Sequence, residues 1–365
     1  MDRIHVQYAF TGDDPKTVAD LIRVEQTIEF PYDLAPSWIQ NQIVGKVEDI
    51  SSPDKANHLI TISYDEDVTG GELTQLLNVL WGNSSLFPGL KIVDLKLPDT
   101  ILSNFKGPRF GISGLRKFFN APTRPLISTA LKPMGSDPAT LAAMAHVLAL
   151  AGFDLIKDDH SLANQPWATW KDRVTEVTRA VQDANAITGG NSAYAPSLNL
   201  PFDQIRDAAH TAKELGAGAL LMLPGITGFD SLRTIAEDDS IALPIQGHPA
   251  MLGSLVISKD VGISHGIVFG TLMRLAGADI SIFPNTGGRF SFTSEQCLKI
   301  ADRSREGLGE LKPSWISPAG GMTLEKIPSM LDMYGHDTAL LIGGALSRGD
   351  LADNAAQMCK IVHAF

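Results

Sequence analysis

The segment Gly152–His160 carries the side chains of this sequence that are best suited to chemistry. A mainly apolar run ends at Lys157, and Asp158, Asp159 and His160 follow directly. A lysine beside carboxylates and an imidazole can hold a metal ion, with its amine carbamylated, or can carry out acid–base catalysis. The segment therefore predicts a buried strand that ends in a metal site or an acid–base site. Asp158 is expected to point away from it and hold the turn or a neighbouring strand.

The part of the chain after Pro125 repeats a short apolar strand followed by a helical pattern. The expected strands are Leu126–Leu131, Phe153–Lys157, Ser192–Ser197, Ala219–Leu223, Leu243–Gly247, Asp279–Phe283, Trp315–Pro318 and Ala339–Ile342. The expected helices include Pro138–Ala151, Thr169–Ala186, Phe202–Leu215, His265–Ala276, Ser294–Gly307 and Leu324–Tyr334. Eight strands alternating with helices predict an α/β fold, a (β/α)8 TIM barrel. A doubly wound open sheet needs fewer strands and a glycine-rich first turn.

The first hundred residues predict a separate α+β domain. Their pattern gives strands at Ile4–Ala9, Gln42–Glu48, Ala56–Tyr64 and Lys91–Lys96, with helices at Pro15–Gln26 and Thr69–Trp81. Such an order is typical of an antiparallel sheet covered by helices. The stretch from Pro98 to Pro125 is rich in Gly, Pro and basic residues. We therefore expect a ferredoxin-like N-terminal domain over residues 1–105 and the barrel over residues 106–365.

The carboxyl ends of the barrel strands are where a TIM barrel places its active site. Lys132 follows the first expected strand, Lys157 closes the second, and His248 follows the fifth. The loop after the sixth strand contains Arg289, which is suited to clamping an anion. His248 precedes a proline and has an alternative interpretation as an ordinary loop histidine.

Two pairs of glycines follow the last two expected strands. They are Gly320-Gly321 after the seventh strand and Gly343-Gly344 after the eighth. Glycine lets backbone N–H groups approach an anion closely, and TIM barrels commonly bind phosphate after these two strands. The pairs therefore predict a phosphate site.

Composition excludes several classes of protein. The 365 residues carry a formal net charge of −11, which argues against a nucleic-acid partner. The two cysteines, Cys297 and Cys359, form no CxxC pair and are expected to be packed thiols in a reducing compartment. No signal peptide is predicted, because the sequence shows no basic leader before an apolar core. No membrane helix is predicted, because no apolar run is long enough. We expect a soluble, cytoplasmic protein.

These motifs resemble those of the RuBisCO large-chain family. The string Lys157-Asp-Asp159-His160 resembles the family's activation motif, whose lysine is carbamylated and holds Mg²⁺ together with the aspartate and a glutamate. The resemblance implies one Mg²⁺ in each subunit, with CO₂ bound as the carbamate of Lys157. Lys132, in Thr-Ala-Leu-Lys-Pro, resembles the lysine that acts as enolisation base, and His248 resembles a catalytic-loop histidine.

The resemblance extends to the substrate and to a second subunit. Both glycine pairs match parts of one phosphate cradle. Glu25 and Asn83 match two residues of the family's N-terminal domain that contribute to the active site of the other subunit across a dimer interface. A phosphorylated substrate and a homodimer or higher oligomer, with the active site at the subunit interface, are therefore implied.

The sequence also departs from the family. The loop Pro284–Ser291 has no lysine where the family steadies CO₂, and Pro249 replaces an arginine of the far phosphate site. Met134, Leu252 and Ile282 replace other polar residues of the family. His160 stands where a carboxylate is expected, although Mg²⁺ prefers oxygen ligands. These departures make the chain similar to the RuBisCO-like proteins, which enolise a substrate without fixing CO₂.

The leading hypothesis is an isomerase that moves protons along a phosphorylated ketose, as RuBisCO-like proteins of methylthioribulose phosphate salvage do. An alternative is a lyase that decarboxylates a β-keto sugar-acid phosphate through the same metal-held enolate, with Arg289 facing the carboxylate. A third possibility is a non-catalytic binding protein that keeps only the scaffold. Deuterium exchange, CO₂ release and metal binding separate the three.

Overall fold

The computed structural model describes residues 3–288, 290, 292–321 and 323–365. The chain forms two compact units, each made of several segments. Unit 1 comprises Met1–Lys106, Leu252–Val268 and Gly307–Leu311. Unit 2 comprises Gly107–Met251, Phe269–Glu306 and Lys312–Phe365. Among the described residues, no helix combines the length and the apolar composition that crossing a bilayer requires.

Unit 1 contains a five-stranded sheet in the order β10-β4-β1-β3-β2. Its strands are β1 (Arg3–Thr11), β2 (Lys46–Ser51), β3 (Asn57–Asp65), β4 (Leu90–Lys96) and β10 (Gly262–Ile263). The first four strands pair antiparallel, as the sequence predicted. However, β10 pairs parallel with β4, so the sheet is mixed. A two-residue strand is too short to give a periodic signal in the sequence.

One expected strand of unit 1 begins later than the sequence predicted. The first residues of Gln42–Glu48 belong to a π-helical turn, Ile39–Ile43, and the strand starts only at Lys46. Gln40 holds this turn by donating its side-chain amide to the carbonyls of Tyr32 and Ala35. The apolar residues of this stretch therefore do not follow strand periodicity.

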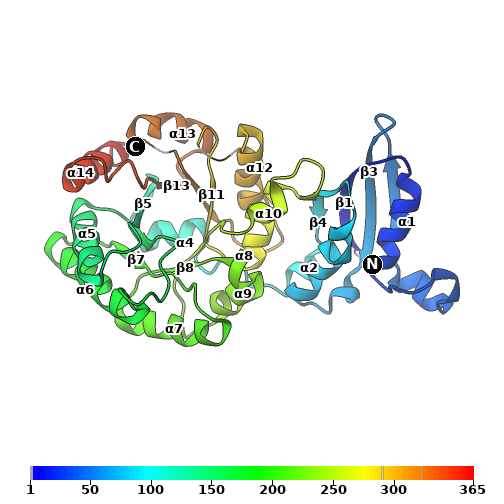
Figure 1. Ribbon diagram of the computed structural model, residues 1–365, viewed down its shortest axis with the longest axis horizontal. Helices are drawn as coiled ribbons and strands as arrows, with labels where there is room; N and C mark the ends of the chain where they lie inside the picture. Colours follow the sequence, from blue (N-terminus) through cyan, green and yellow to red (C-terminus); the bar gives the residue numbers. More distant parts are fainter. Residues whose placement is uncertain (1–2, 289, 291, 322) are drawn as a thin grey trace. The chain divides into compact units, whose positions relative to one another are not determined.

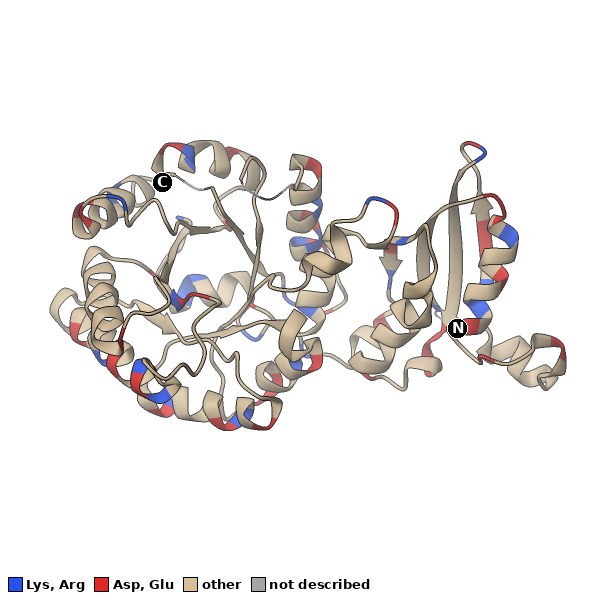
Figure 2. Cartoon of the chain, in the orientation of Figure 1, with Lys and Arg blue, Asp and Glu red and all other residues tan. Residues whose placement is uncertain are grey.

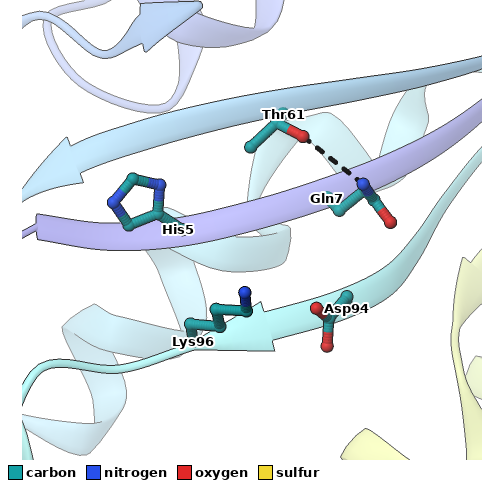
Figure 3. Close-up of a pocket in the computed structure, with 5 residues that line it drawn as sticks. All are labelled: His5, Gln7, Thr61, Asp94 and Lys96. Atoms are coloured by element: carbon teal, nitrogen blue, oxygen red, sulfur yellow. Dashed lines mark hydrogen bonds between the residues drawn. The ribbon is translucent and has the colours of Figure 1, made fainter. Parts of the chain in front are cut away.

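The two faces of the sheet differ in polarity. Ile4, Val6 and Tyr8 of β1 are fully buried on one face, and helix α1 (Pro15–Glu25) packs against β2 and β3. Alternate residues face the other way and line a shallow polar pocket of about 240 Å³ (Figure 3). Its lining residues are His5, Gln7, Thr61, Asp94 and Lys96. The remaining helices of unit 1 are α2 (Leu73–Trp81), α3 (Asp99–Leu102) and α10 (Gly253–Val256).

Unit 2 is the predicted (β/α)8 barrel. Its eight strands pair in parallel in the order β7-β6-β5-β13-β12-β11-β9-β8. They are β5 (Leu126–Leu131), β6 (Leu155–Asp158), β7 (Ala193–Ala195), β8 (Leu220–Met222), β9 (Ile245–Gly247), β11 (Ile280–Pro284), β12 (Trp315–Ala319) and β13 (Ala339–Leu341). The ring closes between β7 and β8, where the Leu198 N–H donates to the Leu221 carbonyl at 2.9 Å.

Helices surround these strands on the outside of the barrel (Figure 1). They are α5 (Pro138–Ala151), α6 (Trp170–Thr188), α7 (Phe202–Leu215), α8 (Pro224–Thr227), α9 (Phe229–Glu237), α11 (Met273–Leu275), α12 (Ser294–Arg305), α13 (Ile327–Tyr334) and α14 (Leu351–Val362). Helix α4 (Gly111–Phe118) does not belong to this outer ring: Figure 1 shows it within the ring, and its Leu115 packs in the interior of the barrel. Asp137 caps α5 by accepting the Thr140 N–H at 2.7 Å, with Pro138 in the first turn. Acidic and basic residues are interspersed along the outer helices (Figure 2).

Apolar side chains fill the barrel interior in two clusters. The lower cluster includes Leu126, Leu155, Ala193, Ile280 and Trp315. The upper cluster, nearer the carboxyl ends of the strands, consists of the buried residues Leu221, Leu223, Ile282 and Leu341. The described part of the barrel interior is therefore packed, and a site is expected at the end above the upper cluster.

A buried ion pair behind β6 sets the orientation of the residues at the end of that strand. Asp158 points outward, as expected, and its Oδ2 accepts from Arg173 Nε of α6 at 3.1 Å. The same oxygen accepts the Ser197 N–H, and Oδ1 accepts the Tyr194 hydroxyl at 2.7 Å. Both side chains of the ion pair are fully buried. Because side chains alternate along a strand, this anchor directs Lys157 towards the barrel axis.

We expect Arg173→Met to lower the free energy of unfolding by about 3–5 kcal/mol, because it leaves the Asp158 carboxylate buried without its cation. Denaturant unfolding measures this change. The control is Arg179→Met on the same helix, whose pair with Asp183 is exposed, for which we expect a loss of about 0–1 kcal/mol. Equal losses in the two variants would contradict the anchoring role of Arg173.

Candidate active site

Charged and ionisable side chains gather at the carboxyl ends of three barrel strands. Lys132 follows β5, Lys157 lies in β6 with Asp159 and His160 directly after it, and His248 follows β9. Register explains the first pairing, since β5 and β6 run side by side with Leu131 opposite Asp158. The structure thus brings together the five residues that the sequence singled out for catalysis and metal binding.

Lys157 is a buried lysine with few polar contacts. It is only 2 % exposed, and its Nζ donates to the carbonyl of Asp158 at 3.0 Å. Burial lowers the pKa of Lys157 to about 8, with the charge of Lys132 acting in the same direction and the Asp159 carboxylate opposing it. A substantial fraction of this amine is therefore neutral in mildly alkaline solution, and the neutral form is the nucleophile.

The carboxylate of Asp159 is bound on both oxygens by donors from its own chain. Its Oδ2 pairs with Lys132 Nζ at 2.7 Å. Its Oδ1 accepts the Ser161 hydroxyl at 2.8 Å and lies 3.2 Å from His160 Nδ1. Burial alone would raise the pKa of Asp159, but the His160 and Lys132 hydrogen bonds and the charge of Lys157 hold it far below its ordinary value. The carboxylate is therefore ionised at any physiological pH.

The rings of His160 and His248 stack on each other. Their centroids are 4.8 Å apart and their planes differ by 14°. His248 Nδ1 accepts the N–H of Ala250 at 3.1 Å, so a neutral His248 carries its proton on Nε2. Burial, aided by the charge of Lys157, lowers the pKa of His248 well below its ordinary value. No pattern in the sequence predicted this contact between residues far apart in the chain.

The glycine pair after β12 lies against the loop after β11. Gly320 and Gly321 have φ values of 88° and 66°, a backbone conformation that glycine adopts at little cost. A Cβ on Gly321 would lie 2.8 Å from the Cα of Gly288. Lys326, which the sequence reasoning missed, donates its Nζ to the Gly321 carbonyl at 2.9 Å. An exposed cation therefore stands beside this glycine pair.

The second glycine pair follows β13 and lies close to the lysine of β5. A Cβ on Gly343 would lie 4.0 Å from Lys132 Cε, whereas one on Gly344 would have no atom of the described residues within 4 Å, its chain neighbours aside. The open space beside Gly344 leaves room for a ligand. Arg289 lies outside the described residues.

Glu25 and Asn83 come together in unit 1. Asn83 donates its side-chain amide to Glu25 Oε1 at 2.8 Å, and both residues end or follow helices, α1 and α2. The two are separated by more than fifty positions in the chain, so the contact depends on the packing of unit 1.

The donor set at the end of β6 fits a divalent cation when Lys157 carries a carboxylate. Among the described residues, no three His, Cys, Asp or Glu side chains are grouped as metal ligands. Asp159 supplies carboxylate oxygens, and His160, oriented through Nδ1, leaves Nε2 for a ligand bond. The ammonium group of Lys132 pairs with Asp159. A metal ion bound by this carboxylate would compete with that group. A carbamate on Lys157 would add the oxygen donor that Asp159 and His160 alone do not supply.

Comparisons with known proteins show which family this chain resembles. The family model for the ribulose bisphosphate carboxylase large chain, catalytic domain, matches residues 111–358. A 5-methylthioribulose-1-phosphate isomerase of Rhodospirillum rubrum is 37% identical over 349 residues, which are 94% of this chain and 91% of that protein. A 2,3-diketo-5-methylthiopentyl-1-phosphate enolase of Bacillus velezensis is 33% identical over 297 residues, 81% of this chain and 73% of that protein.

A solved structure is similar over the whole chain. The crystal structure of a Rubisco-like protein from Rhodopseudomonas palustris has a TM-score of 0.91 and 35% sequence identity, and the match covers 100% of this chain and 99% of that one. The match extends over both units. The chain therefore belongs to the RuBisCO large-chain family, and its relatives are RuBisCO-like proteins.

Proposed function

We propose that this protein is a Mg²⁺-dependent enzyme of the isomerase or enolase type that acts on a phosphorylated ketose. The reaction removes a proton from the carbon next to the ketone, passes through an enediolate and fixes no CO₂. 5-Methylthioribulose 1-phosphate is a substrate of this class, and the name of the Rhodospirillum relative favours it. The observation that carries the proposal is the cluster of Lys132, Lys157 and Asp159 at neighbouring strand ends.

Lys132 is the proposed base. Its side chain is 41% exposed, so its Nζ is accessible to a substrate although it pairs with Asp159. The neutral amine takes the proton from the substrate carbon and returns it to the neighbouring carbon. A proton transfer of this kind needs the amine and the carbon within hydrogen-bond reach, and the phosphate binding site fixes that distance.

Lys157 as its carbamate, Asp159 and His160 are the proposed ligands of one Mg²⁺ ion in each subunit. When bound, the ion acts as a Lewis acid that stabilises the negative charge developing on the substrate oxygens. Asp159 and the carbamate provide the oxygen donors that Mg²⁺ prefers. The neutral His248, with its proton on Nε2, is the proposed hydrogen-bond donor to the substrate.

Backbone N–H groups around Gly320, Gly321, Gly343 and Gly344 are the proposed phosphate site, with Lys326 as an additional cation. Binding energy from the phosphate orients the reacting carbons. Arg289 stays a proposed substrate contact. In a homodimer, Glu25 and Asn83 are proposed to complete the site from the second subunit, as the family resemblance implies. The absence of a lysine from residues 284–291 favours a reaction without CO₂ fixation.

We expect purified protein with Mg²⁺ and bicarbonate to exchange deuterium from D₂O into 5-methylthioribulose 1-phosphate. Lys132→Met should slow this exchange about 10²- to 10⁴-fold, because the base is lost. Lys171→Met, on the outer helix α6, is the matched control and should leave the rate unchanged. Proton NMR of the substrate measures the exchange. Release of CO₂ from a β-keto acid phosphate, with no exchange into the ketose, would contradict the proposal and indicate a lyase.

Activation by CO₂ should depend on pH in a defined direction. The pKa of Lys157, about 8, means that the neutral amine becomes more abundant as pH rises through that value. The rate of activation at constant dissolved CO₂ should therefore increase about tenfold between about pH 7 and about pH 9 and then level off. This activation rate is measured by preincubating the protein with CO₂, stopping the preincubation at successive times and then running the exchange assay. A rate that keeps rising tenfold per pH unit beyond about pH 9 would indicate an unperturbed lysine.

Replacing the imidazole ligand should change which cation is preferred. We expect His160→Glu to raise the affinity for Mg²⁺ about tenfold relative to Co²⁺, because an oxygen donor replaces a nitrogen donor. Calorimetric titration of the carbamylated protein with each ion gives both affinities. His336→Glu, at an exposed turn, is the control. An unchanged Mg²⁺-to-Co²⁺ ratio in His160→Glu would mean that His160 does not bind the cation.

A further inference from the structure

A side-chain amide in the barrel interior lacks hydrogen-bond partners. Gln246 of β9 is 1% exposed, and neither its Oε1 nor its Nε2 has a partner among the described residues. The hydroxyl of Ser128, in β5, is likewise buried and unpaired among these residues. Each buried polar group of this kind costs about 1–3 kcal/mol when it stays unpaired. A buried polar group without a partner therefore calls for an explanation, such as a functional role or a bound water.

Register places Gln246 on the inner face of the barrel. Its neighbours across the sheet are Leu221 of β8 and Ile280 of β11, which both belong to the interior apolar clusters. The next residue, Gly247, faces outward, because a Cβ there would lie 2.6 Å from Met273 Sδ. Two residues after Gln246, His248 again points inward and stacks on His160. Gln246 therefore lies directly below the active site on the same face of the strand.

The inward side chains of such a barrel form layers, each with four members from alternate strands. Following the printed register around the ring places Gln246 in one layer with Ser128, Ala195 and Ser317. The next layer towards the strand ends holds Lys157, and its other members are Leu221, Ile282 and Leu341. Lys157 is therefore surrounded within its layer by apolar side chains and has polar ones immediately below it.

We propose that Gln246 is a positioning residue for Lys157 in its carbamylated form, which it holds by hydrogen bonding from its amide, directly or through one bound water. This inference rests on the proposed function. Carbamylation forms a bond between the lysine nitrogen and the carbon of CO₂, opens one C–O π bond, and releases one proton from the neutral amine to solvent. The product has two acceptor oxygens and a negative charge where the free amine had neither.

The chemistry of the layers matches that product. The apolar members of the Lys157 layer offer no donor to a carboxylate. In contrast, Gln246 Nε2 and Ser128 Oγ are hydrogen-bond donors without a partner among the described residues. The third polar side chain of the layer is different, because Ser317 Oγ already donates to the Ala339 carbonyl at 3.0 Å. Gln246 is the longer of the two unpaired side chains in the layer, so its amide extends farther from its strand than the Ser128 hydroxyl does.

The test compares Gln246→Met with wild type in two measurements. Methionine has nearly the length of glutamine but no polar amide. We expect the affinity for CO₂, measured from the ¹³C NMR signal of the carbamate in protein equilibrated with ¹³C-bicarbonate and Mg²⁺, to fall about tenfold. The melting temperature of the free-amine protein should stay equal or rise, since an unpaired buried amide has been removed.

Ser317→Ala is the matched control, because it alters the same layer at a hydroxyl that is already paired. Its carbamate signal should equal that of wild type. Gln246→Leu provides a second variant if Gln246→Met is poorly folded, and the same loss is expected. A carbamate affinity in folded Gln246→Met or Gln246→Leu equal to wild type would overturn the inference, as would a fall matched by Ser317→Ala. Failure of the proposed function is distinguishable, because it is read from the deuterium exchange of the wild-type protein, whereas this inference is read from the carbamate signal of the variants relative to wild type.

Discussion

The ion pair between Asp158 and Arg173, behind strand β6, is the constraint on which the site depends. It holds the strand end from the outside, together with Tyr194 and the backbone of Ser197, so that Lys157 faces the barrel axis and Asp159 reaches its neighbour on β5. Burial of that lysine then follows, and with it the lowered pKa. A charged cluster outside the barrel thus determines the chemistry that is available inside it, although neither Asp158 nor Arg173 needs to touch a substrate.

The charged side chains at the carboxyl ends of the barrel strands can exchange one ionic partner for another. Asp159 neutralises Lys132 in the free protein, and Lys157 contributes to keeping that carboxylate ionised. Conversion of Lys157 to a carbamate changes a basic nitrogen into an acid group and reverses the local sign of charge. A divalent cation can then replace the ammonium group of Lys132 on Asp159, which leaves Lys132 available to the substrate. Binding of CO₂, cation and substrate is expected to be linked for this reason.

Much of the fold could be predicted from the sequence because local signals were strong. The bounds of Leu126–Leu131, Pro138–Ala151 and Phe202–Leu215 agree with the structure, since an apolar run or a capped amphipathic pattern defines each of them. The strand Gly262–Ile263 and the π-helical turn Ile39–Ile43 have no such local signal. In the site, residue types at strand ends identified the candidates. The Lys132–Asp159 pair, the His160–His248 stack and the unpaired amide of Gln246 depend on register around the barrel, which a sequence pattern does not specify.

A crystal structure of the protein with Mg²⁺, bicarbonate and an unreactive ketose phosphate tests the central claim most directly. The expected density extends from Lys157 Nζ as a carboxylate, a cation lies between that group and Asp159, and Lys132 has moved from Asp159 to the substrate. A free Lys157 amine still bonded to the Asp158 carbonyl, with Lys132 still paired to Asp159 beside a bound substrate analogue, would contradict it.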